Sequence, residues 1–211
     1  MIATLTEHEI MKLIQGPAGK LELAVSAAEP NAKAWGVVCH PHPLFGGTMH
    51  NKVVTTLVKT FQSQGVNTIR FQFRGVGQSQ GEFDHGRGEL DDLYAVLNWL
   101  QHEYGQHPLW LAGFSFGAYI AAQAAAEWPT KKLVTVAPPV ENFAMHLIPP
   151  ILCDWLLLQG EKDEVVSPEA VFAFAESRQP APVVVRFPDA THFFHGQLNA
   201  LRAAIVQWLG G

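Results

Sequence analysis

Short, continuously apolar segments recur along this chain, and they restrict its fold more than any other feature. Such segments are typical of parallel strands covered on both faces, because neither face then needs polar residues. Eight strand-like segments are predicted in total, at residues 8–15, 20–26, 35–39, 66–73, 109–112, 133–136, 155–158 and 183–187. The first two flank Gly16-Pro17-Ala18-Gly19, so we expect them to form a hairpin.

Helical patterns separate the later segments. Apolar residues three and four apart predict helices near residues 50–63 and 88–103. A third helix is expected from about Ser115 to just before Pro129, and Ser167 is a typical cap for a fourth. A last helix carries Leu198, Leu201, Ile205 and Leu209. Strands that alternate with helices predict an α/β fold, with an eight-stranded, mostly parallel sheet and helices on both faces, in one domain over residues 1–211.

The composition excludes several classes of protein. Apolar residues make up 48% of the 211 residues and charged residues 16%, which favours a packed core over disorder. The net charge of −5 and the lack of a basic run argue against nucleic acid or an anionic membrane as partner. The longest nearly apolar stretch, residues 147–158, contains Asp154 and two prolines and is too short to span a bilayer.

The N-terminus and the cysteines bear on the compartment. MIATLTEHEI has neither the basic region nor the long apolar region of a signal peptide. Cys39 and Cys153 each lie in an apolar, strand-like segment and are interpreted as small buried residues rather than a disulfide or metal pair. Both observations fit a cytoplasmic protein.

The motif Gly113-Phe114-Ser115-Phe116-Gly117 carries the strongest chemical signal. It follows an apolar strand and precedes an alanine-rich helix. In that context a serine sits on a sharp strand-to-helix turn, and the flanking glycines remove side chains that would clash there. We therefore expect Ser115 to be a nucleophile.

A serine hydroxyl is a weak nucleophile and needs a base, which in this arrangement follows an acidic residue later in the chain. Asp163 lies 48 residues after Ser115, just past a predicted strand, with Glu161 and Glu164 as nearby alternatives. His192 lies a further 29 residues on, after the last predicted strand. His195 is its rival, but we expect it in the first turn of the final helix.

Stabilisation of a transition-state oxyanion needs two N–H donors. One is expected from the backbone of Phe116. The second should come from the loop His40-Pro41-His42-Pro43-Leu44-Phe45-Gly46-Gly47, where the prolines have no N–H. His42 and Leu44 remain, and Leu44 is preferred because it lies beside the glycines.

Two other motifs are interpreted as structural. His40, His42 and His50 could ligate a metal, but no cysteine or carboxylate lies near them to complete a shell, so no metal or cofactor is expected. The loop Arg74-Gly75-Val76-Gly77-Gln78-Ser79 lacks a phosphate-binding lysine. Arg74 is a minor candidate for a substrate contact.

With these residues in place, the chain from residue 35 onward resembles the α/β-hydrolase superfamily, and most closely its small, lidless bacterial serine hydrolases. Five segments carry the resemblance: HPHPLFGGTM at 40–49, FRGVGQSQGEFDHGRGE at 73–89, GFSFGA at 113–118, GEKDEVV at 160–166 and THFFHG at 191–196. The resemblance implies a triad of Ser115, Asp163 and His192. The group is also similar to dienelactone hydrolases, which use cysteine where this chain has Ser115.

The expected activity is hydrolysis of a small-molecule acyl substrate, an ester, thioester or lactone, through an acyl-enzyme. A peptidase or a carbon–carbon bond hydrolase on the same triad is an alternative, and so is a binding protein that keeps only the fold. The oligomeric state stays open.

Residues 137–151 are too few for a lid domain of two packed helices. The site is therefore expected to be open and to prefer short acyl groups. The apolar residues expected at its border are Phe45, Phe114, Pro138, Phe143 and Phe193.

Overall fold

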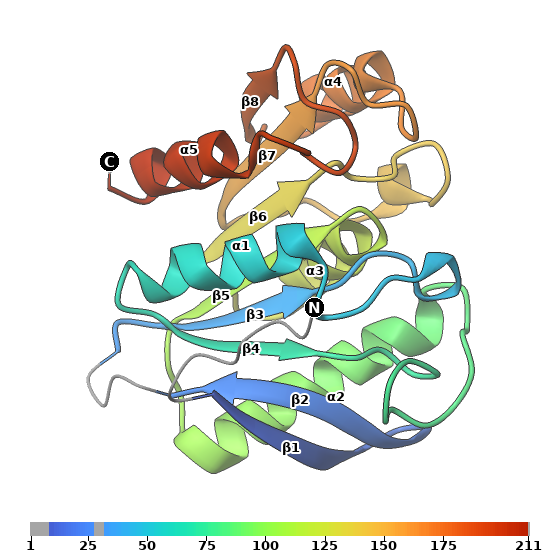
Figure 1. Cartoon of the computed structure of the whole chain (residues 1–211), viewed down its shortest axis with the longest axis vertical. Helices are drawn as coiled ribbons and strands as arrows, with labels where there is room; N and C mark the ends of the chain where they lie inside the picture. The colour runs from blue at the N-terminus through green and yellow to red at the C-terminus, as the bar shows by residue number, and fades with distance from the viewer. Residues whose placement is uncertain (1–8, 28–31, 211) are drawn as a thin grey trace.

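One eight-stranded sheet organises the computed structural model, which describes residues 9–27 and 32–210 (Figure 1). The strand order is β1-β2-β4-β3-β5-β6-β7-β8. The pairs β1–β2 and β2–β4 are antiparallel and all the others are parallel, which confirms the predicted sheet. The strands are β1 (Glu9–Gly16), β2 (Gly19–Ser26), β3 (Trp35–Cys39), β4 (Asn67–Phe71), β5 (Leu109–Phe114), β6 (Lys132–Val136), β7 (Asp154–Gly160) and β8 (Val183–Phe187).

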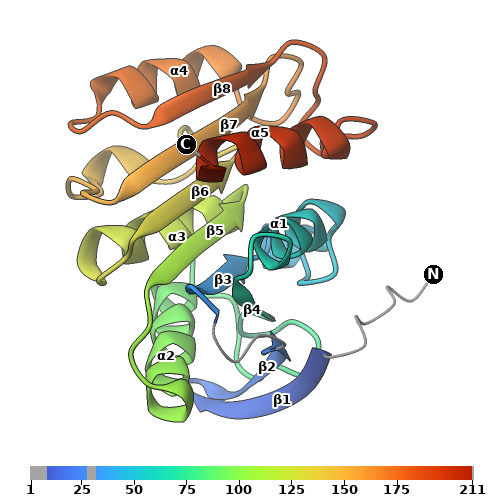
Figure 2. The same ribbon diagram turned by 90° about the vertical axis from the view of Figure 1, so that its left-hand side faces the viewer.

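Helices cover both faces of this sheet (Figure 2). The helices α1 (Lys52–Gln62) and α5 (Leu198–Gly210) lie on one face. The other face carries α2 (Arg87–Tyr104), α3 (Phe116–Glu127) and α4 (Pro168–Ser177). Each face has its own buried apolar cluster, and the short central strands contribute to both. This two-sided burial is the physical reason for their continuous apolar sequence.

Most predicted boundaries hold to within one or two residues. The hairpin forms with Gly16 opposite Gly19, and Ser167 caps α4 by accepting the N–H of Ala170 at 3.1 Å. The predicted strand at 8–15 begins one residue outside the described part of the chain. The predicted strand at 66–73 ends early, at Phe71, because the N–H of Phe73 donates to the His40 ring rather than to a strand.

The segment 137–151 contains one short 3-10 turn, η2 (Met145–Leu147), and no lid domain. Among the described helices, none has the length and apolar character that crossing a membrane would take. Cys39 is buried and Cys153 half-buried, and both are free thiols.

Candidate active site

The three candidate triad residues all follow carboxyl ends of parallel strands. Ser115 comes directly after β5, Asp163 three residues after β7, and His192 five residues after β8. Because the carboxyl ends of parallel strands share one edge of the sheet, the topology brings together residues that are far apart in sequence.

Ser115 occupies a strained turn between β5 and α3. Its φ and ψ angles are 53° and −120°, a conformation that costs a non-glycine residue about 1–3 kcal/mol. A Cβ atom on Gly113 would lie 2.1 Å from the Gly117 carbonyl oxygen, so only glycine fits there. The Ser115 N–H donates to the Val136 carbonyl at 2.9 Å, which ties the turn to the end of β6. The sheet thus holds the hydroxyl in place.

A continuous chain of hydrogen bonds links the three side chains. The Nε2 atom of His192 lies 3.1 Å from the Ser115 Oγ, and its Nδ1 lies 2.9 Å from the Asp163 Oδ2. An ionised carboxylate only accepts hydrogen bonds, so Nδ1 carries the ring proton. Nε2 is then free to accept the serine hydroxyl proton.

Asp163 is held ionised although its side chain is fully buried. Burial raises the pKa of this carboxyl, but hydrogen bonds from His192 and from backbone N–H groups outweigh it and bring the pKa below its usual value. The N–H groups of Val165 and Val166 each donate to Oδ1 at 2.9 Å. The Nε2 amide of Gln159 donates to Oδ2 at 3.0 Å.

His192 is fixed by its backbone as well as its ring. The Oε2 atom of Glu164 accepts the His192 N–H at 3.2 Å, and the ring packs against Phe114 with 5.1 Å between centroids. Glu164, an alternative to Asp163 in the sequence, therefore contacts the backbone of His192 rather than its imidazole. Sequence reasoning missed this role and that of Gln159, although both residues flank Asp163.

Comparisons with known proteins identify the family to which the chain belongs. A family model described as serine aminopeptidase, S33, matches residues 31–152. The chain belongs to this family of serine hydrolases. It is similar to an α/β serine hydrolase homologue from Coxiella burnetii, with 46% identity, a TM-score of 0.90 and coverage of 98% of this chain and 99% of the other.

Two further matches bear on this serine hydrolase. A serine hydrolase without a lid from Xanthomonas campestris is 41% identical, with a TM-score of 0.88 over 96% of this chain and 94% of the other. An uncharacterized protein from Rickettsia prowazekii is 36% identical over 206 residues, which cover 92% of this chain and 86% of the relative. The resemblance to lidless α/β-hydrolases is thereby confirmed.

The loop after β3 offers the hydrolase a different N–H donor from the one expected. The Leu44 N–H already donates to the Nδ1 atom of His42 at 3.2 Å. The N–H groups of Phe45 and Gly47 both donate to the His42 carbonyl, at 3.1 and 3.0 Å. Within the part of the chain that the structure describes, the N–H of His42 has no acceptor. The geometry therefore favours His42 over Leu44.

Phe116 is the first residue of α3, where backbone N–H groups have no partner within the helix. Its N–H directly follows Ser115 and is available to an oxyanion, as the motif predicts. Its ring is buried and anchors the start of the helix.

His195 lies in the exposed loop before α5, not in the first turn of that helix as expected. The helix begins three residues later, at Leu198. The His195 ring stacks on Phe193 with 5.8 Å between centroids. His192 is the histidine that reaches Ser115.

His40 supports the loop after β3 from below. Its Nε2 accepts the Phe73 N–H at 3.0 Å, and its Nδ1 lies 2.6 Å from the Pro41 carbonyl oxygen. Burial lowers the pKa of this imidazole to about 4, so it stays neutral. Both ring nitrogens are engaged, and residues 9–27 and 32–210 hold no cluster of three His, Cys, Asp or Glu side chains suited to a metal ion.

Arg74 anchors its loop to α2 instead of facing a substrate. Its Nη2 lies 2.8 Å from the Oδ1 of buried Asp92, and its own N–H donates to the Asp92 Oδ2 at 2.9 Å. Burial raises the pKa of Asp92, and the contacts with Arg74 oppose that rise.

The predicted border residues fall into two groups. Phe45 is 86% exposed, Phe193 is 42% exposed and Phe143 is half-buried. Their rings pack against His42, His192 and Phe116 respectively. Phe114 and Pro138 are buried, so neither side chain is open to a substrate, contrary to the prediction. Phe143 packs against Phe116 with 5.2 Å between ring centroids.

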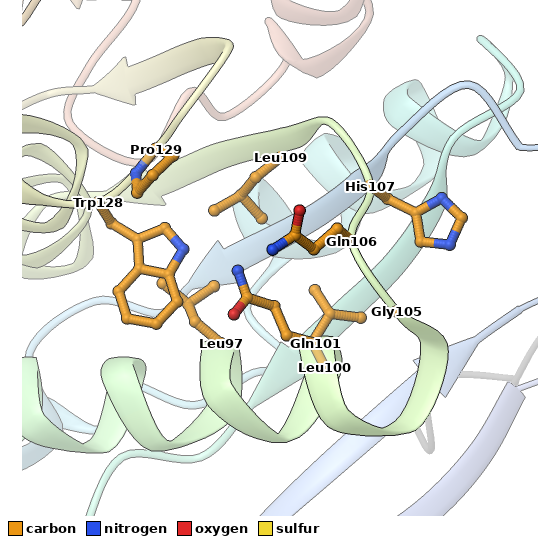
Figure 3. A pocket seen from close by; sticks show the side chains of 9 residues that line it. All are labelled: Leu97, Leu100, Gln101, Gly105, Gln106, His107, Leu109, Trp128 and Pro129. Carbon is orange, nitrogen blue, oxygen red and sulfur yellow. The ribbon is translucent and has the colours of Figure 1, made fainter.

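A cavity of about 160 Å³ lies at the opposite edge of the sheet (Figure 3). Leu109, the first residue of β5, lines it together with residues from the ends of α2 and α3, including Gln101 and Trp128. Since Ser115 follows the last residue of β5, the length of that strand separates this cavity from the candidate triad.

Proposed function

We propose that this serine hydrolase cleaves carboxylic ester-type bonds, in esters, thioesters or lactones, through an acyl-enzyme on Ser115. The observation that carries the proposal is the unbroken set of hydrogen bonds from Ser115 through His192 to Asp163, built on a strained turn. Charged groups held this way are arranged for proton transfer rather than for fold stability alone.

In the proposed mechanism, His192 Nε2 takes the hydroxyl proton as Ser115 Oγ attacks the carbonyl carbon. Asp163 stabilises the imidazolium that forms. The carbon–leaving-group bond breaks as the imidazolium returns the proton to the leaving oxygen or sulfur. A water molecule then attacks the acyl carbon while His192 takes its proton. The bond from that carbon to Ser115 Oγ breaks as the imidazolium gives the proton to Oγ, which releases the carboxylic acid and restores Ser115.

The N–H groups of Phe116 and His42 are proposed to bind the oxyanion. The free N–H of His42 and the occupied N–H of Leu44 support this assignment. Phe45, Phe143 and Phe193 are proposed to border an open acyl site, and the absence of a lid domain supports a preference for short acyl groups.

A peptidase activity is the second candidate, because the matching family is described as an aminopeptidase family. The same triad would serve it, but the leaving amine must be protonated before it departs, which is harder than the release of an activated alcohol. An aminoacyl p-nitroanilide therefore separates the two candidates.

The test is a substrate panel with wild type and Ser115→Ala: p-nitrophenyl acetate and butyrate, longer acyl esters, a thioester, a lactone and aminoacyl p-nitroanilides. We expect wild type to turn over the short esters fastest, and kcat to fall about 10³-fold or more in the variant. Turnover of the anilides alone would favour the peptidase. Ester turnover that Ser115→Ala retains would contradict the proposal.

A further inference from the structure

Gln159 is a polar residue in an apolar strand. It is the penultimate residue of β7, its side chain is fully buried, and the three residues before it are fully buried leucines. Its Nε2 donates to the Asp163 Oδ2 at 3.0 Å and to the Gly160 carbonyl at 3.1 Å. Its Oε1 is buried and has no hydrogen-bond partner among residues 9–27 and 32–210.

An unpartnered buried acceptor is unfavourable, and few occur in native proteins. Leucine or methionine would fill this position without that cost. The amide cannot simply be reversed, because Oε1 would then face the Asp163 carboxylate as a second acceptor. The feature that explains a glutamine at position 159 is therefore its N–H donor, which points at Asp163.

We propose that Gln159 is a positioning residue that acts through Asp163, holding the carboxylate toward His192 and sharing its negative charge. The inference rests on the proposed function. Among the described residues, two donors reach Oδ2, His192 Nδ1 and Gln159 Nε2. The backbone N–H donors both bind Oδ1, from which His192 Nδ1 lies 3.1 Å. Without Gln159, His192 is the sole donor to Oδ2.

The other charged groups nearby are already committed to other partners. The Glu164 carboxylate accepts the His192 N–H, and Lys162 pairs with Asp189 at 2.6 Å on the surface. Within the described residues, Gln159 is thus the one side chain besides His192 that donates a hydrogen bond to the Asp163 carboxylate.

The loss of this donor should shift the pH profile of kcat/KM in one direction. A carboxylate that keeps more of its charge favours the imidazolium form of His192, so the ring is protonated at a higher pH. The catalytic base must be neutral, so the acid limb of kcat/KM moves up, by about half a unit to one unit. At acid pH, well below the midpoint of that limb, kcat/KM falls roughly 3- to 10-fold, and toward the plateau the loss shrinks. KM changes little, because Gln159 lies beneath the site.

The experiment uses Gln159→Met, which keeps the volume, and Gln159→Asn, which keeps an amide but is one methylene too short to reach Asp163. Gln123→Met is the matched control, since Gln123 on α3 also has a buried, unpartnered amide atom but no contact with the triad. The readouts are the imidazole titration of His192 by NMR, assigned with His192→Ala, and the pH profile of kcat/KM.

We expect the titration midpoint to rise in both Gln159 variants and to stay at the wild-type value in Gln123→Met. An unchanged midpoint in the Gln159 variants, or an equal rise in the control, would overturn the proposal. The titration needs no substrate, so it tests Gln159 even if no ester is hydrolysed. A wild-type chain that hydrolyses nothing counts against the proposed function alone.

Discussion

Single side chains decide the chemistry at this sheet edge. Ser115, Asp163 and His192 follow from the sequence because a glycine-flanked serine after a strand, and an acid and a histidine after later strands, come in a recognisable order. The structure brings all three within hydrogen-bond distance.

Replacing each of the two nearby histidines by alanine in turn separates their roles. We expect His192→Ala to lose activity about as far as Ser115→Ala, because the two residues act as one unit. His195→Ala should keep most of its activity, since His195 contacts Phe193 in an exposed loop. Steady-state kinetics on a short ester measures both. The reverse pattern would show that His195 is the base.

The residues that the sequence did not predict correctly depend on local packing. The sequence favours Leu44 over His42 as a donor because of the neighbouring glycines, whereas in the structure the ring of His42 accepts the Leu44 N–H. Phe114 is buried in the apolar cluster on one face of the sheet, and its ring lies 5.1 Å from that of His192. Neither contact has a pattern in the sequence.

At the scale of elements, the loop after β3 packs against the start of α3, where the rings of His42 and Phe116 lie 5.2 Å apart. A Cβ on Gly117 would lie 2.3 Å from the Cys39 carbonyl oxygen, so the first turn of α3 packs directly against the end of β3. Strands and helices could be predicted because their periods and caps are local. Strand ends such as that of β4 could not, because His40 competes for a backbone N–H there.

Proline at position 42 tests the loop as an oxyanion donor. The φ angle of His42 is −54°, which proline adopts without strain, so His42→Pro removes the N–H with little change in backbone geometry. We expect kcat to fall about 10²–10³-fold in this variant. His42→Ala loses the ring but keeps the N–H, and should retain most activity. Equal activity in the two variants would exclude the His42 N–H as a donor.

At the scale of the whole molecule, the sheet separates two apolar cores, and buried polar groups connect its loops. His40 is fully buried between the end of β3 and the end of β4 and stays neutral, with a pKa lowered to about 4 by burial. An unfolded chain would protonate this histidine near its ordinary value of about 6.5. Stability therefore depends on pH through this residue.

Between pH 6.5 and about 4 the unfolded state binds a proton that the folded state does not, so the free energy of unfolding falls as the pH is lowered. The contribution of His40 is about 3 kcal/mol over that range. Asp163 also contributes to stability, because its pKa is lower in the folded protein than in the unfolded chain. That contribution is lost at lower pH, as the carboxyl is protonated.

Urea unfolding across this range measures the effect. His40→Gln keeps an acceptor for the Phe73 N–H but does not titrate, so its stability should depend less steeply on pH. His102→Gln, at an exposed position on α2, serves as the control and should match wild type. If the free energy of unfolding changed equally steeply with pH in wild type and both variants, His40 would not be the source of the pH dependence.

The most direct measurement of the central claim is covalent labelling with a fluorophosphonate, read by intact mass and by peptide mapping. A serine activated by a histidine attacks the phosphorus and displaces fluoride. The labelling experiment therefore does not require the natural substrate to be known. We predict one adduct per chain, on Ser115, and none in Ser115→Ala or in His192→Ala. Labelling at another residue, or undiminished labelling of Ser115→Ala, would contradict the account of Ser115 as the activated nucleophile.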